Sequence, residues 1–188
     1  MPVDVNAVVD RFLLLGHDAG RPLTHIEVQK LLFFLEGWHL AIAGDRLFDE
    51  DFQARANGPV IETIHDRMLR YSAHSIPRSE IKSLDFTVLG SLTLDLISRV
   101  FKTYREYDPG ALIGFTHLPG TPWAQVRSAH GIAKGSASTA IIPKTCMKDW
   151  FSDVLHAALE PANDDLIEAN PEDYADWAET YSLSCRRN

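Results

Sequence analysis

The chain has 188 residues, and 45% of them are hydrophobic, which is enough for one domain with a sizeable core and argues against disorder along the whole chain. It carries a net charge of −8, and this acidic balance gives it no long-range attraction to nucleic acid phosphates. Its two cysteines lie far apart and no apolar stretch approaches ~20 residues, which argues against a disulfide framework, a cysteine-based zinc site and a membrane span.

The N-terminal part is predicted to hold two helices. Asp4 can cap a first helix that runs to about Leu15. Thr24 and Glu27 have the spacing of a capping box at the start of a second helix. Apolar residues then recur at helical spacing through residue 42, and they are so numerous that we expect this helix to be buried on most sides, with Gly44 ending it.

Residues 52–64 read FQARANGPVIETI. Residues 52–56 favour a short extended segment. Pro59 then favours the first position of a third helix over about 59–71, because the N–H that proline lacks would have no partner there. Free N–H groups at such a helix start could bind an anion, but the lysine and hydroxyl residue of a phosphate loop do not follow Gly58. We therefore expect Gly58 and Pro59 to fix the chain path and Val60 to be buried.

The rest of the body is also predicted to be helical, at about 91–106, from Asp108-Pro109 to about 115, from Pro122 to Val126, and through Leu159. Residues 131–139, GIAKGSAST, are typical of a loop. The sequence thus predicts a mainly α fold over residues 1–159, a compact single domain of six to seven helices with at most a short strand or hairpin.

Residues 160–188 form a predicted acidic C-terminal extension. They hold 8 of the 26 acidic residues and only 2 of the 18 basic ones. The acids are interspersed with aromatic residues that include Tyr174 and Trp177. Two interpretations stay open: a solvated tail, or a short amphipathic helix that docks on the body or on a partner.

Catalytic and metal-binding signals are missing from the sequence. The eight histidines have no close metal-ligand spacing, and no nucleophile elbow, phosphate loop or dinucleotide fingerprint occurs. We expect His39 to pack on its helix and His117 to hydrogen-bond a backbone carbonyl. The sequence predicts no catalytic, cofactor or metal residues. A small hydrolase using His117 with Asp49 or Asp51 remains an alternative supported only by the histidine count.

Three motifs occur in a fixed order along the chain. Residues 28–40 read VQKLLFFLEGWHL, residues 54–60 read ARANGPV, and Thr116-His117 is followed by Pro122-Trp123. This order resembles the Panacea domain, the SocA-like antitoxin family that is often encoded in phage-derived regions. The resemblance spans about residues 5–155.

The resemblance implies a cytoplasmic, non-catalytic helical domain that neutralises a toxin, encoded by a neighbouring gene, through direct binding. One type in this family also delivers its toxin to a protease as an adaptor. A DNA-binding regulator of its own operon, using the short helices around 109–130, is the alternative, although the near-neutral body argues against nucleic acid as a partner.

The motif residues are implied to be mainly structural, while other surface residues choose the toxin. The family commonly has an aromatic residue at the position of Arg55, so Arg55 joins Tyr174 and Trp177 as a candidate partner-binding residue. The motif residues are Gln29, Lys30, Leu31, Trp38, His39, Gly58, Pro59, Val60, Thr116, His117, Pro122 and Trp123.

Overall fold

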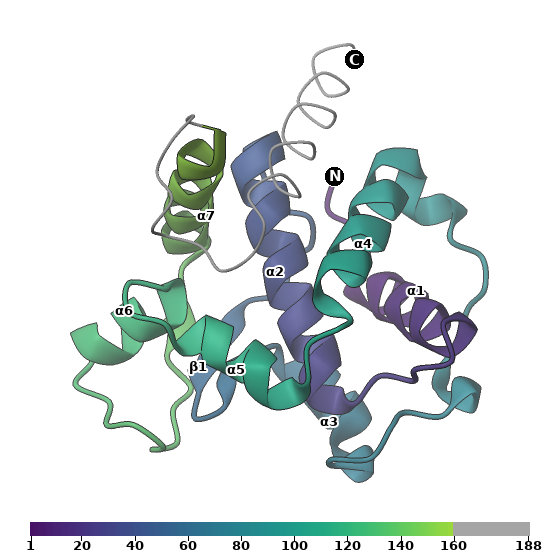
Figure 1. Cartoon of the computed structure of the whole chain (residues 1–188), viewed down its shortest axis with the longest axis horizontal. Coiled ribbons are helices and arrows are strands. Elements are labelled where there is room, and N and C mark those ends of the chain that lie inside the picture. Colours follow the sequence, from purple (N-terminus) through teal and green to yellow (C-terminus); the bar gives the residue numbers. More distant parts are fainter. Residues whose placement is uncertain (160–188) are drawn as a thin grey trace.

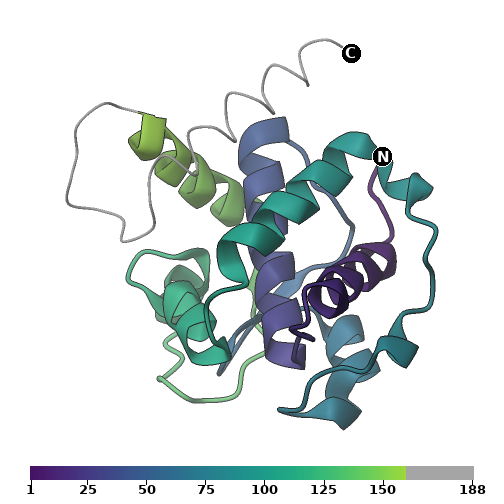
Figure 2. The ribbon, with the colours of Figure 1, turned by 45° about the vertical axis from the view of Figure 1, so that its right-hand side comes forward.

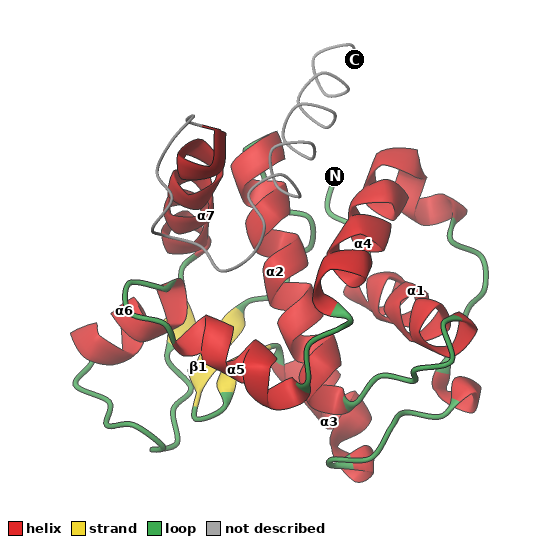
Figure 3. Ribbon diagram, viewed as in Figure 1, coloured by secondary structure: helices red, strands yellow, loops and turns green. Residues whose placement is uncertain are grey.

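A computed structural model describes residues 1–159. Within them the chain forms seven α-helices and a small antiparallel sheet that lies to one side of the fold, as the mainly α prediction expected (Figure 3). The candidate contacts of Tyr174 and Trp177, and the acidic extension itself, lie outside the described residues.

Helix α2 (His25–Ala43) lies at the centre of the fold (Figure 1). Its N-terminus carries the predicted capping box: the backbone N–H of Thr24 donates to Glu27 Oε2 at 2.7 Å, and the Glu27 N–H donates to Thr24 Oγ1. Gly44 ends it in the left-handed conformation, with φ of 79°. Most of its side chains are buried, because other elements pack on nearly every side.

The surrounding helices cover most of the sides of α2, while Ala43 at its C-terminal end is exposed. Helices α1 (Val5–Asp18), α4 (Gly90–Tyr104), α5 (Pro109–His117) and α7 (Lys144–Leu159) all contact it, and the two views show them arranged about its axis (Figures 1 and 2). Helix α7 packs closest at Gly37, where a Cβ atom would lie 2.1 Å from the ring of Phe151. The glycine therefore lets an aromatic side chain fill the α2–α7 contact.

The predicted start of the third helix at Pro59 is wrong, because residues 58–60 form a strand of a hairpin. Strand β1 (Phe52–Arg55) pairs with β2 (Gly58–Val60) on one side and β3 (Ile141–Ile142) on the other. Pro59 thus lies in a strand, and helix α3 (Glu62–Met68) starts only after Ile61. A proline is tolerated here because β2 is an edge strand, where its missing N–H breaks no ladder bond.

The remaining bounds agree with the predicted elements to within a few residues. Asp4, Asp108 and Thr121 accept backbone N–H groups as N-caps of α1, α5 and α6 (Pro122–Ala129). Helix α1 continues past Gly16, which the sequence did not predict. Short 3₁₀ turns follow at Leu69–Tyr71, Arg78–Glu80 and Thr87–Leu89.

Candidate functional site

The motif residues Gln29 and Lys30 attach the central helix to the hairpin. The side-chain amide of Gln29 donates to the Ile61 carbonyl oxygen at 3.1 Å and accepts from the Ile61 N–H at 2.8 Å. Lys30 Nζ donates to the Pro59 carbonyl oxygen at 2.9 Å. These bonds satisfy buried backbone groups that a three-residue edge strand leaves without ladder partners.

Gly58 is required at its position for two independent reasons. Its φ of 97° lies in the region that favours glycine. A Cβ atom there would also lie 2.6 Å from Lys30 Nζ and 2.7 Å from Thr116 Oγ1. The hairpin backbone therefore approaches the lysine amine and the end of α5 at a distance that only glycine allows, and Val60 beside it is buried as predicted.

Lys30 is a buried cation without a paired carboxylate among the described residues. Its side chain is 1% exposed, and burial lowers the pKa of its ammonium group to about 7. Either protonation state can donate the hydrogen bond to Pro59.

His117 and Trp123 form the second part of the site. Their rings stack with centroids 3.7 Å apart and planes 10° apart. The Trp123 indole N–H donates to the Arg55 carbonyl oxygen at 2.8 Å, which ties α6 to the hairpin. The expected hydrogen bond from His117 to a backbone carbonyl is wrong. Its Nε2 atom is buried without a hydrogen-bond partner in the described part of the chain.

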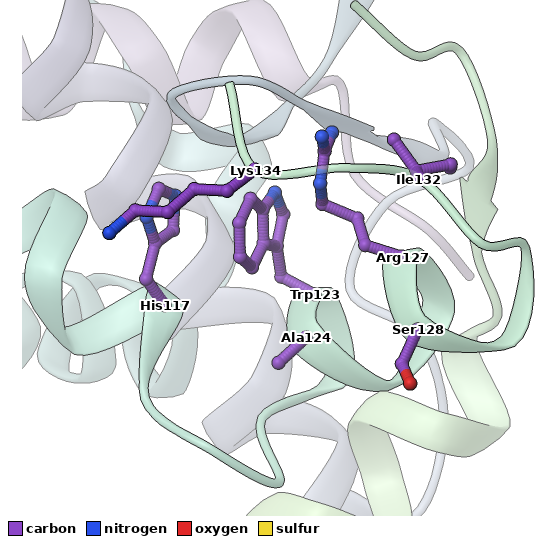
Figure 4. A pocket seen from close by; sticks show the side chains of 7 residues that line it. All are labelled: His117, Trp123, Ala124, Arg127, Ser128, Ile132 and Lys134. Carbon is purple, nitrogen blue, oxygen red and sulfur yellow. The ribbon is translucent and has the colours of Figure 1, made fainter. Parts of the chain in front are cut away.

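Arg127 is a member of the site that sequence reasoning missed. Its guanidinium lies 5.0 Å from the centre of the Trp123 ring, so the indole is placed between His117 and Arg127 (Figure 4). It donates to the carbonyl oxygens of Ala54 at 2.8 Å, Ala133 at 2.5 Å and Ser136 at 3.0 Å. The spacing of four residues between Trp123 and Arg127 on one helix indicates that their side chains are neighbours. The hydrogen bond from Arg127 to the Ala54 carbonyl oxygen has no such local signal, because it spans 73 positions.

A cavity of about 340 Å³ opens beside this stack. Figure 4 shows Lys134 extending past Trp123 toward His117, with Arg127 on the other side of the indole. Burial, and then the charges of Lys30, Arg127 and Lys134, lower the pKa of His117 to about 4. We call this cavity the cationic pocket; its lining includes His117, Trp123, Arg127, Ser128, Ile132 and Lys134.

Other predicted site residues lie apart from the cationic pocket. Leu31 is in the hydrophobic core, and the Trp38 indole N–H donates to the Tyr104 hydroxyl at 3.3 Å. His39 hydrogen-bonds the Asp45 carbonyl oxygen at 2.8 Å through Nδ1. Arg55 is half-buried and pairs with Glu62 at 2.9 Å, so its charge is already engaged within the hairpin region.

Thr116 and Pro122 shape the connection between the two helices of the site. The Thr121 hydroxyl lies 2.8 Å from the Thr116 carbonyl oxygen and also accepts from the Ala124 N–H, which caps α6. Pro122 occupies the first turn of α6, as predicted. This tight connection brings His117 and Trp123 face to face.

Residues 1–159 contain neither a candidate metal-binding cluster nor a membrane-spanning helix. No group of three or more His, Cys, Asp and Glu side chains there is placed to hold a metal ion. None of the helices described has both the length and the apolar character needed to cross a membrane.

Comparison with protein families identifies the family of this chain. Residues 28–124 match the family described as antitoxin SocA-like, Panacea domain, a span that includes Lys30, Gly58 and Trp123 and ends before Arg127 and Lys134 of the cationic pocket. Searches of curated proteins and of solved structures gave no significant match. Since the matched residues make up more than half of the chain, this protein belongs to the SocA-like antitoxin family with a Panacea domain.

Proposed function

We propose that the protein is an antitoxin that neutralises a cognate toxin, encoded by a neighbouring gene, through direct and non-catalytic binding. The observation that carries the proposal is the family match over residues 28–124. The inward placement of the motif residues indicates that they maintain the fold, while other residues on the surface bind the partner. Lys30, Gly58 and Trp123 hold the hairpin to α2 and α6, which leaves the outer faces of these elements to recognise a partner.

Co-expression with adjacent gene products tests this proposal. Each adjacent reading frame is expressed alone and together with this protein, and growth and co-purification are measured. One product should arrest growth alone, permit growth in the presence of this protein, and co-purify with it. The proposal fails if no adjacent product is toxic, or if the toxic one is neither rescued nor bound.

A folding-defective variant provides the matched control for that experiment. Gly37→Leu places a side chain in space that the Phe151 ring occupies, since even a Cβ atom would lie 2.1 Å from it. This variant should lose both rescue and co-purification. If it rescued growth as well as the wild type, relief of toxicity would not depend on the folded domain.

Toxin turnover separates simple neutralisation from proteolytic delivery, which we propose as a second mode of action. If the protein acts as an adaptor, the half-life of the toxin shortens when the two are co-expressed, and removal of the responsible protease restores it. If the protein acts by binding alone, the half-life is unchanged or longer while growth is still rescued.

A further inference from the structure

The cationic pocket concentrates positive charge without nearby acidic residues. Lys30, Arg127 and Lys134 all act electrostatically on His117, and no Asp or Glu side chain lines the cavity. Lys30 and Arg127 are 1% and 3% exposed, yet neither forms an ion pair within residues 1–159. Because buried cations are normally paired, this region has an uncompensated positive field that favours an anionic group.

The hydrogen bonds already made in the pocket select the kind of anion. Both terminal nitrogens of Arg127 are used by the carbonyl oxygens of Ala54, Ala133 and Ser136. The guanidinium therefore cannot offer the two-pronged contact that phosphate sites exploit. The exposed donors that line the cavity are the Lys134 ammonium and the Ser128 hydroxyl, whereas the unpartnered Nε2 of His117 is buried. Two donors beside an aromatic wall suit a single carboxylate better than a phosphate group.

The form of the pocket indicates that the carboxylate belongs to a protein. Trp123 and Arg127 are 6% and 3% exposed, so they fix the wall of the cavity from inside the protein. Lys134 lies exposed beside it, on the loop that follows α6. A cavity of about 340 Å³ is at the lower end of the range for small-molecule sites, and one acidic side chain with its flanking backbone fits it.

We propose that the cationic pocket receives an aspartate or glutamate side chain of the toxin, which pairs with the exposed Lys134 ammonium and lies in the positive field of Lys30 and Arg127. This inference rests on the proposed antitoxin function. The bound carboxylate pairs with Lys134 and favours the protonated imidazole of His117, so complex formation raises the pKa of His117 and takes up protons at mildly acidic pH.

The first experiment needs no toxin. The isotope-labelled full chain is titrated with a peptide of three consecutive glutamates and blocked ends, and separately with the matching glutamine peptide and with inorganic phosphate. The NMR signals of the Trp123 indole N–H and the His117 imidazole are followed. We expect the glutamate peptide alone to shift both signals at millimolar concentration and to raise the pKa of His117. Lys134→Gln should weaken this response at least fivefold.

Three outcomes of the first experiment would overturn the inference. In the first, the signals move with none of the probes. In the second, they move equally with the glutamate and glutamine peptides. In the third, they move with phosphate and not with the glutamate peptide. The last result would assign the pocket to phosphate instead of a protein carboxylate.

The second experiment measures the affinity of charge-reversed variants for the toxin. Lys134→Glu should weaken toxin binding at least tenfold, whereas Lys82→Glu, a charge reversal at an exposed lysine in the segment between α3 and α4, should change it less than twofold. One Asp or Glu to Lys change in the toxin should restore binding to the Lys134→Glu variant. Equal affinities for the two variants overturn the pocket inference and leave the antitoxin proposal standing. If no adjacent gene product is a toxin that the wild-type protein binds, the antitoxin proposal is wrong. The peptide titration then still tests whether the pocket binds a carboxylate.

Discussion

Lys30 of the central helix donates its side-chain hydrogen bond to the carbonyl oxygen of Pro59 at 2.9 Å, from a position that is 1% exposed. The bond links two of the three motifs that mark this family, and the neighbouring glycine makes it geometrically possible. The same contact places a cation inside the protein beside His117. One residue thus contributes to both the architecture and the electrostatics of the site.

Gly58→Ala should destabilise the protein by more than about 2 kcal/mol, because a positive φ and two close contacts act together. Gly120→Ala is the matched control: Gly120 also has a positive φ, of 82°, but a Cβ atom there would meet nothing within 4 Å. The control should lose about 1 kcal/mol from backbone strain alone. Urea unfolding of both variants measures the difference, and equal losses would show that crowding at Gly58 contributes nothing.

The buried amine of Lys30 predicts a stability that rises with pH above neutrality. Its pKa is about 7 in the folded protein and near 10.5 in the unfolded chain. Between these values the unfolded chain binds more protons, so the free energy of unfolding increases with pH, by up to about 1.4 kcal/mol per pH unit. Below pH 7 the Lys30 amine is protonated in both the folded and the unfolded state, so it adds no further pH dependence to the free energy of unfolding.

Lys30→Met isolates that term, because the same measurement on both proteins cancels the other titrating groups. The difference in unfolding free energy, wild type minus variant, should grow between pH 7 and pH 10 in favour of the wild type. A constant difference across this range would mean that the ammonium of Lys30 is not desolvated in the folded protein.

Local signals in the sequence predicted much of the helical framework. The capping box of Thr24 and Glu27, and the Asp108-Pro109 start of α5, involve residues three or fewer positions apart, so they are visible in a short window. The helix start at Pro59 was wrong because the signal is ambiguous. A missing N–H suits the first turn of a helix and an edge strand equally well.

The candidate site was less predictable, since distant contacts build it. Trp123 was identified through its motif, but its partner Arg55 lies 68 positions away and Arg127 reaches Ala54 across 73 positions. No periodicity reports such a contact. The burial of Lys30 was equally hidden, because a lysine on an amphipathic helix ordinarily extends to solvent.

Acid should destabilise the protein through His25 and His117, whose pKa values are both lowered to about 4, first by burial and then by nearby positive groups. Between pH 6.5 and 4 the unfolded chain binds protons that the folded protein excludes. The free energy of unfolding therefore decreases as the pH is lowered through this window. His25→Phe and His117→Phe keep an aromatic ring and should each flatten the fall. His130→Phe, at an exposed histidine, is the control, and equal curves for all three variants would contradict the prediction.

Removal of residues 160–188 should separate folding from partner binding. The hydrophobic core described here extends from Val5 to Leu155, so a chain ending at Leu159 should keep its free energy of unfolding to within about 1 kcal/mol. The removed segment carries 8 acidic and 2 basic residues. If it meets a basic surface of the toxin, its loss should slow association and make the association rate less dependent on salt. The dissociation rate should change less than the association rate. Stopped-flow binding at two salt concentrations measures both effects, and unchanged rates in a folded truncated protein would show that the extension is not part of the interface.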